Sequence, residues 1–201
     1  MTERLEVITG CMFAGKTDEM IRLAERQEYA GRKVQLFKPA IDTRWGELSA
    51  VKSHGGRKKD ATPVKDSQHL LSLVDRDTKI VAIDEAQFLD EGIVGVVSEL
   101  LDRDIKVLVA GLPLDFRGEP FGSMPVLLAK ADNTIKVTAV CTHSENGEIC
   151  GGEATRTQRF INGQPSNYSD PVIQIGEEEY AARCPQHHVV PGRPDKNKNV
   201  I

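Results

Sequence analysis

The sequence predicts an α/β fold, in which a parallel β-sheet carries helices on both faces and a small domain follows. Strand and helix signals alternate through the first two thirds of the chain, an order typical of parallel sheets. Three of the four cysteines fall within residues 141–188, where every strand signal is short. We therefore expect an α/β domain over residues 1–140, a metal-stapled domain over 141–188 and a disordered tail over 189–201.

The first strand and helix of the predicted sheet enclose a glycine-rich loop. Residues 5–9 read as a strand, and residues 16–30 read as a helix that Gly31 stops. One face of this helix is formed by Met20, Leu23, Ala24 and Gln27. Residues 34–38 read as the second strand, which Pro39 ends.

The later elements continue the alternation. Residues 80–83 are all apolar, as expected for a strand buried on both faces, and Asp90 is placed to cap the next helix. The apolar residues of that helix are Ile93, Val94, Val97, Leu100 and Leu101. Residues 105–110 read as another buried strand, 123–131 as a short helix and 135–140 as the last strand of the sheet.

Residues 40–66 break the pattern because they are polar and include a basic cluster at residues 55–59. A loop of this length in a compact domain is usually functional or mobile. Two interpretations stay open, namely a solvated surface loop and a lid near bound phosphates.

Residues 10–17 match a phosphate-binding motif between a strand and a helix. In chain order they are Gly10, Cys11, Met12, Phe13, Ala14, Gly15, Lys16 and Thr17. The glycines let backbone N–H groups surround phosphate oxygens, and the helix N-terminus adds the positive end of its dipole. Lys16 is expected to reach the β- and γ-phosphates and Thr17 to bind Mg²⁺. The motif predicts a P-loop, RecA-like domain that binds ATP with Mg²⁺.

Two carboxylates, Asp84 and Glu85, directly follow the buried strand at residues 80–83. Ligands bind at this edge of parallel sheets, so both side chains should lie beside the phosphate-binding loop. Asp84 is the expected Mg²⁺ partner, and Glu85 is expected to take a proton from the attacking oxygen. The alternative is that the pair only caps the following helix, although Asp90 already offers a cap.

If the attacking oxygen is a substrate hydroxyl, as in a kinase, and not water, as in an ATPase, the protein needs a second pocket. Apolar residues that could form such a pocket follow two of the predicted strands. They are Leu112, Phe116 and Phe121 after one strand, with Gln87 and Phe88 beside Glu85 after the other. Apolar side chains with few polar groups suit a flat heterocycle. Ordinary core packing is the alternative for each aromatic residue alone.

Four residues in the C-terminal third are expected to hold one structural Zn²⁺, namely Cys141, Cys150, Cys184 and His187. Asn146 and Gly147 form a strong turn signal, so the residues between the first two cysteines can double back as a hairpin. His143 or His188 could replace His187 as a ligand. Reduced cysteines without a metal are the alternative.

Cys11 invites a separate hypothesis because it lies in a loop of N–H donors, at a helix N-terminus and near Lys16. Such surroundings lower a thiol pKa and make the thiol reactive. An inert, packed cysteine is the alternative.

Composition limits the partners and the compartment. The formal net charge of −4 argues against a broad nucleic-acid footprint. The N-terminus carries no secretory signal, and no apolar stretch is long enough to cross a membrane. We therefore expect a cytoplasmic protein that binds neither nucleic acid nor a membrane.

These motifs together resemble the type II thymidine kinase family, which carries a zinc-bearing lasso domain. The matching blocks span nearly the whole chain and comprise residues 12–17, 42–44, 84–88, 115–121 and 155–159, with Tyr180 ahead of Cys184. The sequence differs from the usual family pattern at Cys11, at Pro113 and in the longer spacing between Cys141 and Cys150.

The resemblance implies roles for individual residues. Glu85 would be the general base on the thymidine 5′-hydroxyl, and Arg44 would stabilise charge on the transferring phosphoryl group. The implied substrate-binding residues are Met12, Gln87, Phe88, Leu112, Phe116, Thr157 and Tyr180. A loop around residues 160–180 would close over the nucleoside, and the family is typically homotetrameric and inhibited by the end-product triphosphate. The competing function is a P-loop ATPase that is not a kinase and carries a zinc interaction module.

Overall fold

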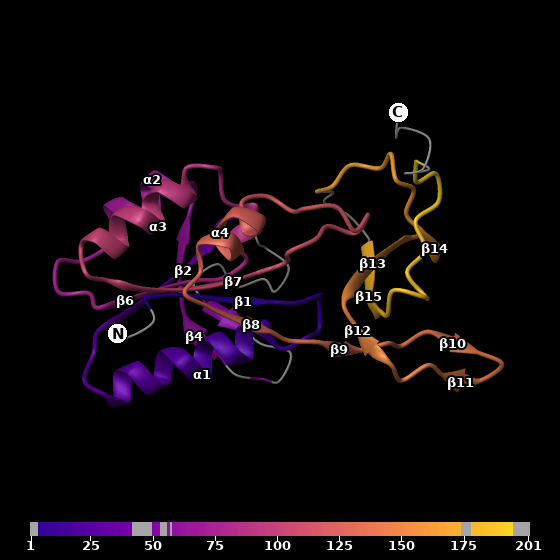
Figure 1. Cartoon of the computed structure of the whole chain (residues 1–201), viewed down its shortest axis with the longest axis horizontal. Coiled ribbons are helices and arrows are strands. Elements are labelled where there is room, and N and C mark those ends of the chain that lie inside the picture. Colours follow the sequence, from indigo (N-terminus) through magenta and orange to yellow (C-terminus); the bar gives the residue numbers. More distant parts are fainter. Residues whose placement is uncertain (1–3, 42–49, 53–55, 57, 174–177, 195–201) are drawn as a thin grey trace.

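The computed structural model describes residues 4–41, 50–52, 56, 58–173 and 178–194 of the 201. Figure 1 shows a layered sheet-and-helix domain beside a group of short strands formed by the later part of the chain. We call the described residues between 139 and 194 the C-terminal part.

Six strands form one parallel sheet, in the order β5-β2-β6-β7-β1-β8. The strands are β1 (Leu5–Thr9), β2 (Val34–Pro39), β5 (Thr62–Val64), β6 (Ile80–Ile83), β7 (Lys106–Gly111) and β8 (Asn133–Lys136). All residues of β1 and β6 are buried, and for β6 the continuous apolar run predicts this burial on both faces. The predicted α/β fold with a parallel sheet is confirmed.

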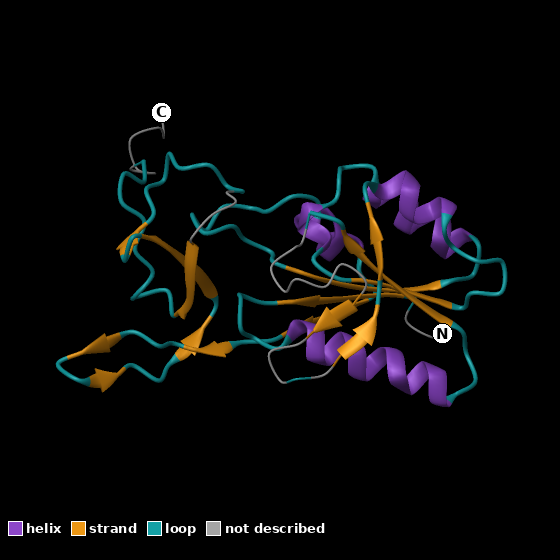
Figure 2. Cartoon of the chain, turned by 180° about the vertical axis from the view of Figure 1, so that it is seen from behind, coloured by secondary structure: helices purple, strands orange, loops and turns teal. Residues whose placement is uncertain are grey.

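Helices cover both faces of this sheet (Figures 1 and 2). The helix α1 (Lys16–Tyr29) packs on one face through Met20, Leu23 and Ala24. The other face is covered by α2 (Ser67–Ser72), α3 (Ile93–Asp102) and α4 (Met124–Lys130). A short 3₁₀ helix, η1 (Ala86–Phe88), follows β6.

The predicted strand over residues 135–140 is wrong as a single element. The chain leaves the main sheet after β8 and then forms β9 (Ala139–Val140), which pairs with β12 (Glu153–Ala154) in the C-terminal part. Between β8 and β9 the chain passes close to Gly10, where a Cβ would lie only 2.2 Å from the carbonyl oxygen of Val137. The segment that leaves the main sheet therefore lies against the start of the phosphate-binding loop.

The predicted helix cap at Asp90 is also wrong. The N-cap of α3 is Gly92, and the Asp90 carboxylate instead accepts hydrogen bonds from the Ser67 N–H (2.7 Å) and hydroxyl (2.9 Å) at the start of α2. It also accepts from the Gly92 N–H at 3.1 Å. Burial opposes ionisation of Asp90, but these hydrogen bonds hold its pKa below the usual range. Asp90 therefore ties together the starts of two helices.

The polar segment at residues 40–66 contains more structure than a loop. Its described residues form the hairpin β3 (Ala50–Lys52) and β4 (Lys58–Asp60), followed by the edge strand β5. Lys59 makes an ion pair of 2.7 Å with Glu28 of α1. Residues 42–49, 53–55 and 57 lie outside the described residues, so the lid interpretation stays a prediction.

The C-terminal part consists of small antiparallel sheets (Figure 2). Besides β9 and β12 they contain β10 (Ser144–Glu145), β11 (Glu148–Ile149), β13 (Arg156–Ile161), β14 (Gln164–Pro165) and β15 (Glu178–Arg183). The start of the predicted tail is held against this part, because Val189 exchanges two hydrogen bonds with the Gln158 side chain. Residues 195–201 lie outside the described residues.

Candidate active site

The phosphate-binding loop (residues 10–17) connects β1 to α1 at the carboxyl edge of the sheet. Gly15, at φ 82°, is the N-cap of α1 and makes no side-chain cap, which leaves the first N–H groups of the helix for an anion. The Lys16 ammonium is buried and donates to the carbonyl of Cys11 at 2.9 Å. The loop therefore has the donors and the buried cation that a phosphate group requires.

The loop also contacts the C-terminal part. The Met12 N–H donates to the hydroxyl of Thr157 at 3.0 Å, and the Cys11 thiol donates to the carbonyl of Ala154 at 3.2 Å. The prediction of a reactive Cys11 thiol is wrong, because burial raises its pKa against the opposing effects of neighbouring hydrogen bonds and Lys16. The structure supports the alternative of an inert, packed cysteine.

Oxygen ligands for a divalent cation lie next to this loop. The Thr17 hydroxyl donates to the Asp84 carboxylate at 3.1 Å, and Asp84 also accepts from the N–H of Glu85 at 3.0 Å. Burial, reinforced by the charge of Glu85, raises the pKa of Asp84 to about 7, and Lys16 opposes this shift. A hydroxyl and a carboxylate are ligands that Mg²⁺ prefers, so the donor set fits that ion.

Replacing Asp84 by asparagine should stabilise the Mg²⁺-free protein at pH 8. A carboxyl with a raised pKa contributes stability below its unfolded pKa of about 3.9 and loses it as the pH rises through about 7. We expect Asp84→Asn to increase the free energy of unfolding at pH 8 by at least about 1 kcal/mol, with the difference shrinking toward pH 5. Urea unfolding at both pH values, with Asp102→Asn as an exposed control, measures it. A variant that is less stable than the wild type at pH 8 contradicts the expectation.

Glu85 takes an unusual backbone conformation where β6 passes into η1. Its φ of 49° lies in the left-handed region, which a residue with a side chain adopts only when its surroundings hold it. The Gln87 side chain supplies part of that support, because its amide N–H donates to the Glu85 carboxylate and its amide oxygen accepts from the Leu112 N–H at 3.0 Å. Both ends of the buried Gln87 amide are therefore committed to protein partners.

The residues predicted to bind the base come from both parts of the chain. Leu112 and Phe116 are buried after β7, and the Phe88 ring meets the Phe121 ring edge to face at 5.5 Å. Tyr180 of β15 is paired with Arg159 of β13. Arg44 lies outside the described residues, so its predicted role is not tested.

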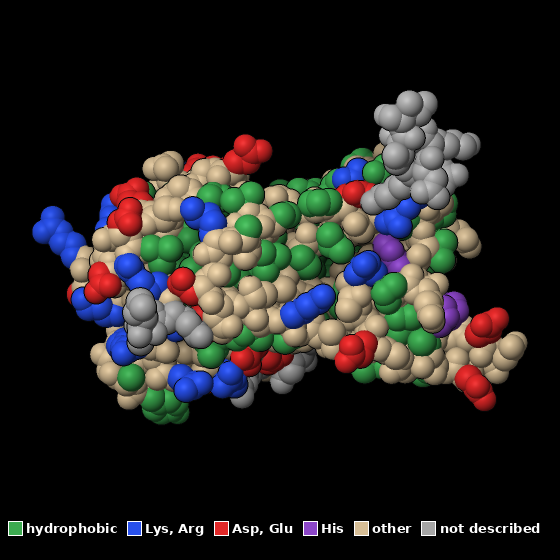
Figure 3. Space-filling view, in the orientation of Figure 1, with side chains coloured by type: hydrophobic (Ala, Val, Ile, Leu, Met, Phe, Trp, Pro, Cys, Tyr) green, Lys and Arg blue, Asp and Glu red, His purple; other side chains and the backbone are tan. Residues whose placement is uncertain are grey.

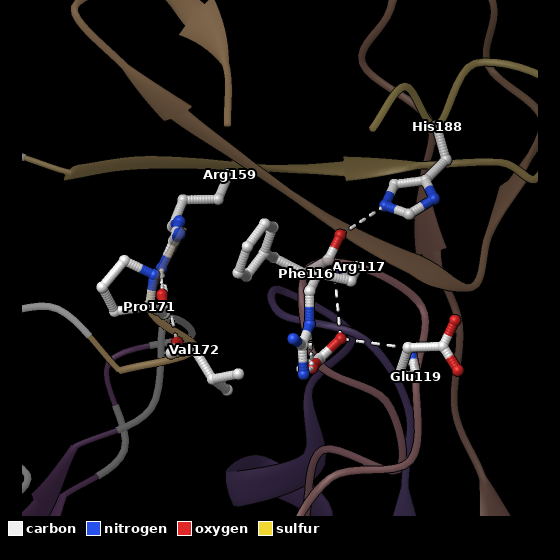
Figure 4. A network of polar contacts seen from close by, with 8 residues as sticks. Phe116, Arg117, Glu119, Arg159, Pro171, Val172 and His188 are labelled. Atoms are coloured by element: carbon white, nitrogen blue, oxygen red, sulfur yellow. Dashed lines mark hydrogen bonds and ion pairs between the residues drawn. The ribbon is translucent and has the colours of Figure 1, made fainter. Parts of the chain in front are cut away.

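Two residues outside the predicted substrate-binding set contact Phe116 (Figure 4). The Arg159 guanidinium lies over the Phe116 ring, 3.6 Å from its centroid, and the His188 side chain donates to the Phe116 carbonyl at 2.8 Å. The sequence offered a signal for Arg159, because it lies two positions after Thr157 on the same strand. Side chains two positions apart in a strand share a face, so Arg159 lies on the same face as a predicted substrate-binding residue.

The predicted metal ligands converge. The sulfur atoms of Cys141, Cys150 and Cys184 and a ring nitrogen of His187 lie within 4.8 Å of one another. The turn at Asn146 and Gly147 has both φ angles positive (51° and 85°) and joins β10 to β11, which confirms the predicted hairpin. These four residues form a Cys₃His cluster, a ligand set consistent with structural zinc.

The two alternative histidine ligands have other contacts. His143 stacks on the ring of His187 with centroids 4.2 Å apart, and His188 binds the Phe116 carbonyl. The Cys141 thiol is buried, which opposes ionisation, but hydrogen bonds from Cys184, His143 and His187 lower its pKa to about 6. A thiol that ionises this readily is suited to bind a metal.

Acidic and basic side chains are interspersed over the face shown in Figure 3. No helix in the described part of the chain is long and apolar enough to span a membrane.

Comparisons with known proteins match this arrangement. A family model described as "Thymidine kinase" matches residues 3–188. A relative from Coprothermobacter proteolyticus, named "Thymidine kinase", is 50% identical over 190 residues, which cover 94% of this chain and 92% of the relative. The family match includes the phosphate-binding loop, both carboxylates and the Cys₃His cluster.

Proposed function

Because this chain belongs to the thymidine kinase family, we propose that it transfers the γ-phosphate of ATP to the 5′-hydroxyl of thymidine and forms thymidine monophosphate. One observation carries the proposal beyond the family match. The phosphate-binding loop, the pair formed by Thr17 and Asp84, and Glu85 all meet at one edge of the sheet. That edge therefore has a donor site and a candidate base side by side.

The donor side of the reaction is assigned to the phosphate-binding loop. Its N–H groups and Lys16 would bind the phosphates, and Lys16 would exchange its contact with the Cys11 carbonyl for phosphate oxygens. Thr17 and Asp84 would hold Mg²⁺, which when bound neutralises charge on the phosphates. The mutual contact of these two side chains supports a shared ion.

The acceptor side is assigned to Glu85. Its carboxylate would accept the proton of the 5′-hydroxyl while Gln87 holds it in position. The thymine would bind near Leu112, Phe116 and Tyr180, which come from both parts of the chain. Arg44 would stabilise charge on the transferring phosphoryl group, a role taken from the resemblance alone.

We assign the Cys₃His cluster to one structural zinc ion. Four nitrogen and sulfur ligands fill a tetrahedral site and leave no open position for catalysis. A homotetramer, which the resemblance implies, and a cytoplasmic location remain our predictions.

Gln87→Leu should reduce turnover because Gln87 holds the Glu85 carboxylate in position. The change removes the hydrogen bond to Glu85 and leaves the buried Leu112 N–H without a partner. We expect kcat to fall by about 10-fold or more, as for loss of roughly 1.4 kcal/mol or more of positioning. Steady-state kinetics over a range of pH measure the effect, because the titration of Glu85 should shift as well. An unchanged kcat and pH profile would exclude this positioning role.

A nucleoside panel tests the function itself. Purified protein is incubated with ATP and Mg²⁺, with each natural deoxynucleoside in turn and with none, and both ADP and monophosphate are measured. We expect ADP formation to require thymidine and to equal thymidine monophosphate in amount. ADP released at the same rate without any nucleoside would instead support an ATPase.

A further inference from the structure

A buried arginine joins the residues after β7 to the C-terminal part. The Arg159 side chain has no exposed surface. Its Nε donates to the Ser166 hydroxyl at 3.0 Å, and its Nη1 donates to the carbonyls of Pro171 (2.7 Å) and Val172 (3.3 Å). Through these contacts one guanidinium holds both ends of the segment 166–172, and Figure 4 shows the contacts at Pro171 and Val172.

The same guanidinium also holds Phe116. Its flat face lies 3.6 Å from the centre of the Phe116 ring, and the Phe116 backbone is fixed separately by the His188 side chain. In a second contact of this kind the arginine comes from the residues after β7 and the ring from the C-terminal part, since Arg117 lies over the ring of Tyr168 at 5.3 Å. One arginine–aromatic contact thus links Phe116 to Arg159, which holds the segment 166–172, and a second links Arg117 to Tyr168 within that segment.

The arrangement carries an energetic cost. Within the described part of the chain, the buried Nη2 of Arg159 has no hydrogen-bond partner, and the rest of the guanidinium contacts a neutral hydroxyl, neutral carbonyls and a ring. A buried donor without a partner is uncommon in native proteins, and a charged one is especially unfavourable. Such a group is more readily explained by a role in the site than by stability.

We propose that Arg159 is a positioning residue for the nucleoside, which fixes the Phe116 ring and the segment 166–172 in one arrangement and thereby sets nucleoside affinity. The proposal rests on the proposed function, because Phe116 is assigned there to the thymine site. Lysine cannot replace this side chain, since an ammonium has neither the planar fork nor the flat face. The Arg159 side chain contacts Phe116 and the segment 166–172, whereas Lys16 contacts the Cys11 carbonyl, so ATP binding should not depend on Arg159.

Two variants and one control test the proposal. Arg159→Lys keeps the charge but loses the fork, and Ser166→Ala removes only the acceptor of Nε. The matched control is Arg183→Lys. In the wild type, Arg183 also lies over an aromatic ring, that of Phe160 at 5.6 Å, but it donates a hydrogen bond to Thr142 and not to the segment 166–172. For each protein the KM for thymidine, the KM for ATP and kcat are measured, together with hydrogen exchange of residues 166–173 without ligands.

We expect Arg159→Lys to raise the KM for thymidine about tenfold or more, because hydrogen bonds from charged donors commonly contribute at least that factor. The KM for ATP and kcat should change little, Ser166→Ala should show a smaller effect in the same direction, and Arg183→Lys should match the wild type. Hydrogen exchange of residues 166–173 should accelerate in both test variants.

An unchanged thymidine KM with unchanged exchange overturns the proposal. So does a fall in kcat, or a rise in the KM for ATP, that equals the change in the thymidine KM, since either shows general damage. If the wild-type protein does not phosphorylate thymidine, the proposed function fails. The exchange comparison then still decides whether Arg159 holds the segment 166–172.

Discussion

Glu85→Gln is expected to lower kcat for thymidine phosphorylation by about 10²–10⁴-fold, the usual contribution of a general base. The substitution keeps the size of the side chain and an oxygen that can accept the hydrogen bond from Gln87. It removes the ability to take a proton from the 5′-hydroxyl. The backbone at φ 49° and the neighbouring Asp84 should remain as they are, so the loss is chemical rather than structural.

Substrate binding separates this explanation from a damaged site. Calorimetry should give thymidine and ATP affinities for Glu85→Gln within a fewfold of the wild type, and the exposed Glu91→Gln provides the control for a loss of charge. Near-normal turnover would remove Glu85 from the role of base. Loss of thymidine binding in parallel with turnover would assign it to binding instead.

Cys184→Ser is expected to release the metal and loosen the C-terminal part. The buried apolar residues of that part are few, and two of them, Cys141 and Cys184, belong to the Cys₃His cluster itself. So small an apolar cluster cannot hold a domain of this size closed, and the proposed zinc ion would supply the missing stability. Because Thr157 and Tyr180 belong to the same part, the KM for thymidine should rise while ATP still binds.

Metal analysis and kinetics together test this expectation. Protein purified without chelator should contain about one zinc per chain, and Cys184→Ser should contain almost none, as four ligands fill one tetrahedral site. Ser144→Ala, on the exposed hairpin, is the control. Wild-type protein stripped by chelator and returned to Mg²⁺ alone should behave like the variant and recover with zinc. Zinc-free protein with an unchanged thymidine KM would refute the structural role.

Features that depend on neighbouring residues could be predicted from the sequence. The strand at residues 80–83 is a continuous apolar run, which is typical of a sheet covered on both faces. The phosphate-binding loop is a local motif between a strand and a helix, and the Asn146–Gly147 turn brings Cys141 and Cys150 together. In each case the physical cause lies within a few residues.

Features that depend on distant contacts could not be predicted. The apolar pattern of residues 135–140 runs across the point where the chain leaves the main sheet. The chain passes close to Gly10 there, at Val137, and residues 139–140 pair with β12 instead. The local sequence around Asp90 predicts a helix cap, because it does not show that Ser67, far away in the sequence, donates hydrogen bonds to the Asp90 carboxylate. The burial of Arg159 likewise depends on Phe116 and on carbonyls more than ten residues away.

The contacts of Cys11 and Met12 mean that the two parts of this protein are not interchangeable modules. Cys11 and Ala14 of the phosphate-binding loop pack in one apolar cluster with Cys141 and Cys184 of the Cys₃His cluster. Cutting the chain after β8 would expose that cluster and leave the Met12 N–H without its acceptor. A C-terminal part grafted from another protein would therefore have to fit the phosphate-binding loop as well as form its own Cys₃His cluster.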